Sequence, residues 1–364
     1  MQKEYYDVAF FPDTLKRGGA ERVTIRLSEY MQKKGMKVAI ITTNNPCDGE
    51  YKVPYGVSRI CVGIKEKNLL KLVVGYIKLL KKIHISMGII MGLPQGCYII
   101  PACLRTKTKC IISERNSPEN FDGKQITKWI MTFMMKFADG YIFQTKEAKN
   151  YYKIKKPYRI ISNPVDSAHI PKKKTETIIS NIISVGRYAP QKNQRLLIEA
   201  IQDVRKKYPN VHLDIYGEGQ LFKKLKNLIV DMNLQENVCL KGTSNNILEI
   251  EATYGMFVLS SDFEGIPNAL LEAMAIGLPC ISTDCPCGGP ASVINNKENG
   301  LLVPVGNKKS MASAIIWMIE HPYDACKMGK CAEKVRNVFS IQCIGDSWIE
   351  FIRTLRKEEE RKCK

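Results

Sequence analysis

The chain has 364 residues, 45% of them hydrophobic, which is enough for two globular domains of ordinary size. No stretch reaches about 18 apolar residues without a charge, and the start lacks the basic and apolar segments of a signal peptide. The 13 cysteines are scattered and often lie in apolar strands, as reduced thiols do, and Cys285-Pro-Cys287 has no companion zinc ligands. We therefore expect a cytoplasmic protein without a metal site, either free or peripheral on the inner face of the plasma membrane.

The positive charge is concentrated in the first half of the chain. The net charge is +19, and residues 1–170 hold 29 Lys and Arg against 14 Asp and Glu. Such an excess indicates an acidic partner, which could be nucleic acid, anionic lipid or a phosphate-bearing acceptor. A general lysine bias with solvated helix faces is the alternative explanation for part of it.

The first half reads as strands that alternate with helices, which predicts a mainly parallel sheet with helices on both faces. Amphipathic helices are expected at residues 20–34 and 68–83. The expected strands are residues 6–11, 38–43, 58–62, 87–91, 109–113, 140–144 and 158–161.

Gly18 and Gly19 lie between the first expected strand and the first expected helix. Glycines let backbone approach a ligand closely, and a helix N-terminus favours anions. The signal is weak by itself, because a Gly-Gly turn is commonly only a turn and the third glycine of a dinucleotide fingerprint is absent.

The helix expected at residues 68–83 places lysines beside an aliphatic face. Two interpretations are open: a core-packed helix with a solvated rim, or an interfacial helix held against anionic lipid headgroups. The lysines are Lys71, Lys78, Lys81 and Lys82.

The alternating pattern breaks near residue 166, which we take as the end of a first domain at 1–166. Residues 167–177 contain Pro171 and three consecutive lysines and are expected to be a linker. A second alternating series, at 178–340, predicts another parallel sheet, so the two sheets should leave a cleft at their strand C-termini. A final helical segment occupies 341–364.

The expected strands of the second series are 178–185, 211–216, 238–241, 256–260, 280–283 and 301–303. The later helical stretches are 194–207, 221–232, 246–252, 310–320, 323–338 and 341–357.

Two loops at strand ends of the second series carry residues suited to phosphate and nucleoside. Gly186, Arg187 and Lys192 follow its first strand, where the arginine fork and the lysine charge suit a diphosphate. Gly217 and Gly219 follow its second strand and permit close approach of a nucleoside. We expect both side chains of the Arg187–Lys192 pair on a solvent-facing loop.

A short apolar helix, expected to begin at Pro267 and to end at Gly277, is preceded by Glu264 and contains Glu272. No Lys or Arg lies nearby in sequence, so a ligand could be the partner of these carboxylates. Two acceptor oxygens suit the adjacent hydroxyls of a sugar, and the N–H groups of residues 266–269 favour phosphate. A nucleotide sugar contains both the adjacent hydroxyls and the phosphate. The alternative is a helix-start acid at Glu264 and an exposed Glu272.

At this point the motifs resemble the retaining nucleotide-sugar glycosyltransferases of family 4, which have the two-domain GT-B fold. The resemblance covers nearly the whole chain, and the two glutamates with the upstream Gly-Arg…Lys are its most specific part. The motifs are GGAERV (18–23), SNPVD (162–166), SVGRYAPQKN (184–193), IYGEG (215–219), EGIPNALLE (264–272) and NGLLVPVGN (299–307).

The resemblance implies roles for these residues. Arg187 and Lys192 would hold the donor diphosphate, Glu264 would contact the donor sugar near the reacting carbon, and Glu272 would accept the ribose hydroxyls. The final helix would pack back on the N-terminal domain, and CPCGGP (285–290) is similar to a loop of members that use UDP-sugars. The implied catalytic residues are Glu264, Arg187 and Lys192. The implied donor-binding residues are Gly18, Gly19, Gly186, Gly217, Gly219, Ile266, Pro267, Asn268, Ala269 and Glu272.

The chain departs from the family pattern after the strand expected at 109–113. Many members carry a histidine followed by an acid there, whereas this chain has Glu114, Arg115 and Asn116. The sequence SERN is similar to polysaccharide and lipid-linked-oligosaccharide branches, so we assign these three residues to the acceptor side. No Asp-x-Asp occurs, which fits a metal-independent transferase in which Arg187 and Lys192 replace a divalent cation.

The sequence thus predicts an α/β protein of two Rossmann-like domains that moves a hexose or N-acetylhexosamine from a UDP-sugar to a glycan carried on a polyprenyl diphosphate. No cofactor or metal is expected. An anionic membrane surface is a possible partner, and nucleic acid is not expected. The alternatives are a GT-B-like UDP-sugar epimerase, an inactive scaffold, or a basic nucleic-acid-binding protein, which would leave the two glutamates unexplained.

Overall fold

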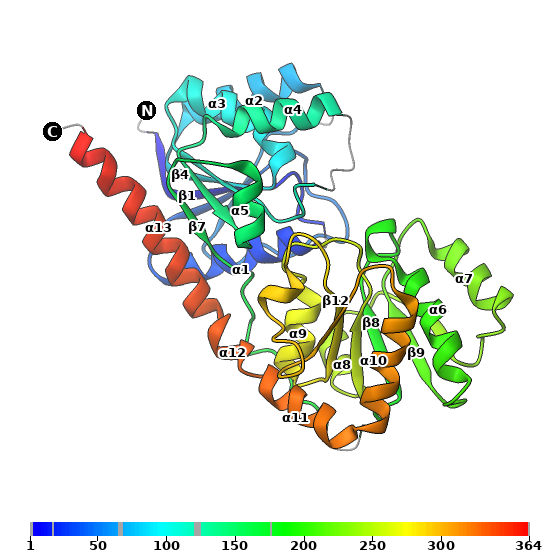
Figure 1. Cartoon of the computed structure of the whole chain (residues 1–364). Coiled ribbons are helices and arrows are strands. Elements are labelled where there is room, and N and C mark those ends of the chain that lie inside the picture. The colour runs from blue at the N-terminus through cyan, green and yellow to red at the C-terminus, as the bar shows by residue number, and fades with distance from the viewer. Residues whose placement is uncertain (1–2, 17, 65–67, 120–124, 175–176, 363–364) are drawn as a thin grey trace. The chain divides into compact units, whose positions relative to one another are not determined.

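The computed structural model describes residues 3–16, 18–64, 68–119, 125–174 and 177–362 (Figure 1). Arg17 in the first glycine loop, residues 175–176 of the expected linker and the two ends of the chain lie outside these ranges. The chain divides into a first unit, Met1–Pro164 with Ile341–Lys364, and a second unit, Val165–Ser340. In the described ranges, no helix combines the length and hydropathy needed to cross a bilayer.

The first unit is built on a seven-stranded parallel sheet in the order β3-β2-β1-β4-β5-β6-β7. Its inner strands are mostly buried and apolar, as expected when helices cover both faces, whereas the edge strands β3 and β7 are half-buried or exposed. β4 begins four residues before the expected strand because Ile83 and Ile85 point inward and alternate with His84 and Ser86. The strands are β1 (Glu4–Phe11), β2 (Val38–Thr42), β3 (Ser58–Cys61), β4 (Ile83–Met91), β5 (Cys110–Ser113), β6 (Gly140–Phe143) and β7 (Tyr158–Ile160).

The helices of the first unit lie on both faces of its sheet, as right-handed crossovers require. α2, α3 and α4 are neighbours on one face (Figure 1). α13 packs along α1, and the Tyr30 hydroxyl donates to Asp346 Oδ1 at 2.8 Å. The helices are α1 (Gly19–Lys33), α2 (Leu69–Lys82), α3 (Leu93–Thr106), α4 (Gln125–Met135), α5 (Lys146–Tyr152) and α13 (Ile341–Lys362).

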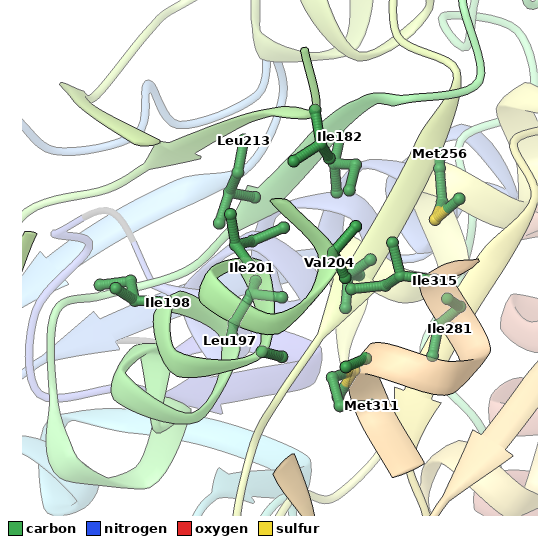
Figure 2. Packing of buried hydrophobic residues seen from close by; sticks show 14 of the residues in the cluster. Ile182, Leu197, Ile198, Ile201, Val204, Leu213, Met256, Ile281, Met311 and Ile315 are labelled. Atoms are coloured by element: carbon green, nitrogen blue, oxygen red, sulfur yellow. The ribbon is translucent and has the colours of Figure 1, made fainter. Parts of the chain in front are cut away.

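The second unit has a six-stranded parallel sheet in the order β10-β9-β8-β11-β12-β13. Alternate residues of each strand serve separate cores: Ile182 packs with α6 and α10 (Figure 2), whereas Ile183 packs with α9. The strands are β8 (Asn181–Val185), β9 (His212–Tyr216), β10 (Val238–Gly242), β11 (Met256–Leu259), β12 (Cys280–Thr283) and β13 (Leu301–Val303).

Helices and short 3-10 turns connect these strands. The helix expected at 323–338 is two helices, because the backbone hydrogen bonds of Arg336 and Asn337 go to residues three positions back. Residues 170–174 pack on the second unit, where the Lys173 N–H donates to the Ile276 carbonyl at 3.0 Å. The elements are η1 (Pro190–Lys192), α6 (Gln194–Arg205), α7 (Phe222–Asp231), α8 (Ile247–Glu251), α9 (Asn268–Ile276), η2 (Pro290–Ser292), α10 (Lys308–Glu320), α11 (Pro322–Ala332) and α12 (Val335–Val338).

Candidate active site

The loop after β8 presents the predicted phosphate-binding residues in different settings. Arg187 is exposed, as expected. Lys192, at the end of η1, does not face solvent as predicted, because its side chain is only 16% exposed. A methyl group on Gly186 would lie 3.3 Å from Cδ and Cε of Lys192, so this glycine leaves room for the lysine chain. The loop therefore carries the exposed guanidinium of Arg187 and the mostly buried ammonium of Lys192.

Lys192 is enclosed because it forms an ion pair with the buried Glu264 carboxylate. The same carboxylate accepts hydrogen bonds from the Ser261 hydroxyl at 2.8 Å and from Gln191 Nε2 at 3.3 Å. Glu264 therefore has a protein partner, although no Lys or Arg lies near it in the sequence. The fold brings the loops after β8 and β11 together, and a residue 72 positions away supplies the cation. Such a charged pair needs its remaining hydrogen bonds to offset desolvation, and these donors supply them.

Further hydrogen bonds fix the two loops to each other. The Asp262 N–H donates to the Gln191 carbonyl at 2.9 Å, and Asn193 Nδ2 donates to Asp262 Oδ1 at 2.7 Å. Sequence reasoning missed Gln191, Ser261 and Asp262 as site residues. The available signal was proximity in the sequence. Gln191 precedes Lys192, and Ser261 and Asp262 lie just before Glu264.

The glycine turn after β9 packs directly on the loop after β8. Gly217 and Gly219 both have φ of +153°. A methyl group on Gly217 would lie 2.0 Å from the Gly186 carbonyl oxygen, and one on Gly219 would lie 2.5 Å from that of Tyr188. The close approach that requires glycine here is therefore to neighbouring backbone. The two loops therefore pack backbone against backbone.

Gly217→Ala is expected to lower the free energy of unfolding by more than about 1 kcal/mol, because its φ is unfavourable for alanine and the methyl meets backbone. Urea unfolding of parent and variant measures the loss. Gly306→Ala is the matched control, since Gly306 has φ of +69° but nothing within 4 Å of an added methyl. Equal losses in the two variants would contradict a specific clash between the loops.

The CPCGGP loop after β12 forms another wall beside Glu264. The Glu264 N–H donates to the Pro286 carbonyl at 2.9 Å, and the Cys287 N–H donates to the Glu264 carbonyl at 3.3 Å. Burial raises the pKa of the Cys285 thiol to about 12, which favours the neutral thiol. Over the described residues, no three His, Cys, Asp or Glu side chains gather as a metal site would require.

Helix α9 begins one residue later than expected, with Pro267 at the N-cap and Gly277 in the left-handed conformation at its end. Glu272 is 3% exposed, which excludes the alternative of an exposed glutamate. Glu264 lies four residues before the helix and pairs with Lys192, so it is not a helix-start acid. Ile266 and Pro267 are buried, whereas Asn268 and Ala269 are half-buried.

In the first unit, Gly18 is the N-cap of α1 and Gly19 is its exposed first residue. Glu114 follows β5, and its carboxylate accepts from the N–H groups of Arg115 at 2.8 Å and Asn116 at 2.9 Å. The Tyr152 hydroxyl, which the sequence did not indicate, donates to the same carboxylate at 3.0 Å. Glu114 therefore shapes the turn that carries its two neighbours.

Burial acts on both charges of this turn. It raises the pKa of the Glu114 carboxyl, against the hydrogen bonds from Asn116 and Tyr152. It lowers the pKa of the Arg115 guanidinium to about 9, against the attraction of Glu114. Arg115 Nη1 donates to Ser113 Oγ at 3.4 Å, and Nη2 is buried with no hydrogen-bond partner among the described residues.

Known proteins resemble the chain in both units. The model named glycosyl transferases group 1 matches residues 166–335, and the model named glycosyltransferase family 4 matches residues 17–169. An uncharacterized glycosyltransferase of Methanocaldococcus jannaschii is 35% identical over 219 residues, which are 52% of this chain and 53% of that protein.

A second relative matches over most of its length. It is the N-acetylgalactosamine-N,N'-diacetylbacillosaminyl-diphospho-undecaprenol 4-alpha-N-acetylgalactosaminyltransferase of Campylobacter jejuni, 29% identical over 342 residues, 88% of this chain and 91% of the relative. Among solved structures, Anabaena HepE in complex with UDP-glucose has a TM-score of 0.80 at 18% identity, covering 96% of this chain and 100% of that one. At this identity the likeness shows the fold alone.

Two Rossmann-like units, each on a parallel sheet, together with this likeness define the GT-B fold class. Because the two family models together match residues from 17 to 335, the chain belongs to the family 4 glycosyltransferases. This confirms the predicted fold class and family.

Proposed function

We propose that the chain is a retaining glycosyltransferase that moves a hexose or N-acetylhexosamine from a UDP-sugar to a glycan acceptor on a polyprenyl diphosphate. The observation that carries the proposal is the buried Lys192–Glu264 ion pair beside the exposed Arg187, at the carboxyl ends of β8 and β11. This edge of a parallel sheet is where such folds bind ligands. The names of the Campylobacter jejuni and Anabaena proteins support the acceptor and donor classes.

The residues suit the charges that develop during transfer. As the bond from the anomeric carbon to the diphosphate breaks, negative charge grows on the leaving group and positive charge on the sugar. Arg187 and Lys192 would stabilise the diphosphate, and Glu264 would stabilise the sugar carbon. Lys192, Ser261 and Gln191 already contact the Glu264 carboxylate before the donor arrives, so little reorganisation of these side chains is needed.

We infer front-face departure and attack for retention, because Glu264 is committed to Lys192 and a covalent route would need it as a free nucleophile. In this mechanism the two cations also take the place of a divalent metal. Glu272 would bind the ribose hydroxyls, and the turn of Glu114, Arg115 and Asn116 would face the acceptor. Gly18, Gly19 and the backbone of residues 266–269 would contact phosphate and sugar.

Thermal shift against UDP-, GDP- and ADP-sugars tests the donor, since a ligand that binds the native state raises its melting temperature. We expect a shift with a UDP-sugar, and transfer in the presence of EDTA that retains the anomeric configuration by NMR. Epimer formed from the UDP-sugar without acceptor would favour the epimerase alternative. An inverted product or EDTA-sensitive transfer would refute the mechanism.

The four lysines of α2 support a peripheral membrane location. Leu72, Tyr76 and Leu80 face the core, while the lysines are exposed. A groove of about 600 Å³ between α2 and the segment after β3 has an apolar floor that includes Val62 and Ile64. Lys71, Lys78 and Lys82 also line it. Cations around an apolar floor suit an anionic lipid.

Replacing the α2 lysines, Lys71, Lys78, Lys81 and Lys82, with glutamine is expected to release the protein from anionic vesicles at low salt. Each lysine near such a surface contributes about 1 kcal/mol, and salt screens this attraction. Co-sedimentation across a salt series is the measurement, with transfer to a soluble acceptor expected to be unchanged. A variant with the same charge change on exposed lysines of the second unit, Lys223, Lys224, Lys226 and Lys309, is the control. Equal release of both variants would refute a specific role for α2.

A further inference from the structure

The helix layer of the first unit that contains α2, α3 and α4 has no acidic side chain in any of the three helices. The three helices are adjacent and form one face in Figure 1. Besides the α2 lysines, this layer carries Arg105 and Lys128. On the opposite side of the sheet, α1 and α13 contain acids, including Glu29 and Glu350. The three helices therefore lack the carboxylates that α1 and α13 contain.

Three aromatic side chains of this layer, Trp129, Phe133 and Phe137, form an exposed strip that we call the aromatic strip. They are spaced by four residues along α4 and the turn after it, so they share one side. Their exposed fractions are 68%, 44% and 41%. Trp129 stacks on Phe133 at 5.7 Å between ring centroids, and Phe133 contacts Phe137 edge-on at 5.3 Å. The aromatic strip is therefore a continuous apolar surface in contact with solvent.

Other side chains of α4 face the core, because Met131 and Met135 are buried. The neighbouring helices add exposed aliphatic side chains, namely Leu70 and Val74 on α2 and Leu104 on α3. Contiguous apolar surface with a polar rim marks an interaction site. The fold itself does not require these side chains to be apolar.

We propose that this layer is a bilayer-docking face, in which the aromatic strip enters the interfacial region and the lysines meet anionic headgroups. Trp and aliphatic side chains beside Lys, without acids, are the composition of interfacial helices. A second copy of the chain is a poor occupant, because a symmetric contact through this layer would place lysines against lysines with no carboxylate between them. The inference deepens the proposed function, since a lipid-linked acceptor lies at a bilayer.

Trp129 provides a direct probe, because the chain has only three tryptophans. Trp348 is fully buried, and Trp317 is half-buried and stacks on His321 in the second unit. With vesicles of phosphatidylcholine and phosphatidylglycerol that carry brominated acyl chains, we expect quenching of the parent's tryptophan fluorescence. Trp129→Phe should bind the same vesicles but lose most of this quenching. A parent without quenching, or a variant that keeps it, would overturn insertion of the strip.

The triple variant Trp129→Ser, Phe133→Ser, Phe137→Ser is expected to lower the vesicle partition coefficient about tenfold or more, and to remove the binding that persists at high salt. Three exposed apolar residues of the second unit, Val230, Tyr323 and Val338, replaced by serine are the control. Unchanged partition of the triple variant would refute the proposal. A parent that is dimeric by ultracentrifugation and becomes monomeric in the triple variant would refute it in favour of a second copy.

Vesicle binding is measured without donor or acceptor, so its outcome does not depend on whether the proposed transfer reaction occurs. The triple variant should keep its circular dichroism spectrum and its transfer to a soluble acceptor. Vesicle binding of the parent with no transfer to any acceptor would refute the proposed function and leave the docking face in place.

Discussion

Arg187→Ala is expected to lower turnover about tenfold or more while leaving the free energy of unfolding unchanged. Tenfold in rate corresponds to about 1.4 kcal/mol of transition-state stabilisation, which is modest for a cation on a departing diphosphate. The fold should tolerate the change, because Arg187 is exposed. Initial rates with the UDP-sugar identified by thermal shift, beside urea unfolding, measure the two effects. Arg195→Ala is the control, since Arg195 is an exposed arginine on α6 of the same unit that pairs with Glu199.

Lys192→Ala is expected to differ by reducing both rate and stability. Its removal leaves the Glu264 carboxylate buried without a cation, at a cost of about 2–3 kcal/mol. The double variant Lys192→Met, Glu264→Gln should recover most of the stability and none of the activity. Stability that returns without activity would show that the Lys192–Glu264 pair takes part in catalysis and is not only structural. If Arg187→Ala and Lys192→Met keep parent rates with every donor, the diphosphate assignment is wrong.

The sheets were predictable from sequence because parallel strands with both faces covered are short, largely apolar runs. Residues 181–185 and 256–259 are examples, each followed by a glycine or serine loop. Helix α3 was harder to identify, since Pro94 and Pro101 lie within it and no capping side chain marks its start. The backbone hydrogen bonds that separate α11 from α12 left no recognisable signal in the sequence.

The sequence indicated the loops that carry the candidate residues but not the contacts among these residues. Both glutamates were singled out, but the sequence left open whether Glu272 is exposed, and the structure shows that it is buried. The partner of Glu264 depends on the order of β8 and β11 in the sheet, which brings residues 192 and 264 together. Similarly, Gly217 was predicted to permit close approach of a nucleoside, and the structure shows the Gly186 carbonyl in close approach to it. Residue types such as glycine predicted the positions of close approach. Which group comes close depends on the order of the strands in the sheet.

Glu272→Gln is expected to weaken UDP binding about tenfold or more, because it turns a carboxylate that can accept from two ribose hydroxyls into an amide with one acceptor oxygen. The side chains have nearly the same shape, so the packing of α9 should be retained. Calorimetric titration with UDP, which contains the ribose but no donor sugar, isolates this contact from any effect at the anomeric carbon. Glu264→Gln should change UDP affinity far less than Glu272→Gln and should reduce transfer more.

The matched control is Glu251→Gln, since Glu251 is a glutamate of the same unit that is equally buried but lies on α8, outside every motif. If loss of a buried negative charge only lowered the stability of the second unit, the two variants would lose similar stability and similar UDP affinity. If Glu272 binds ribose, only its variant loses affinity, and saturating UDP raises the melting temperature of Glu251→Gln as much as that of the parent. An unchanged UDP affinity in Glu272→Gln would instead assign this glutamate to the packing of α9.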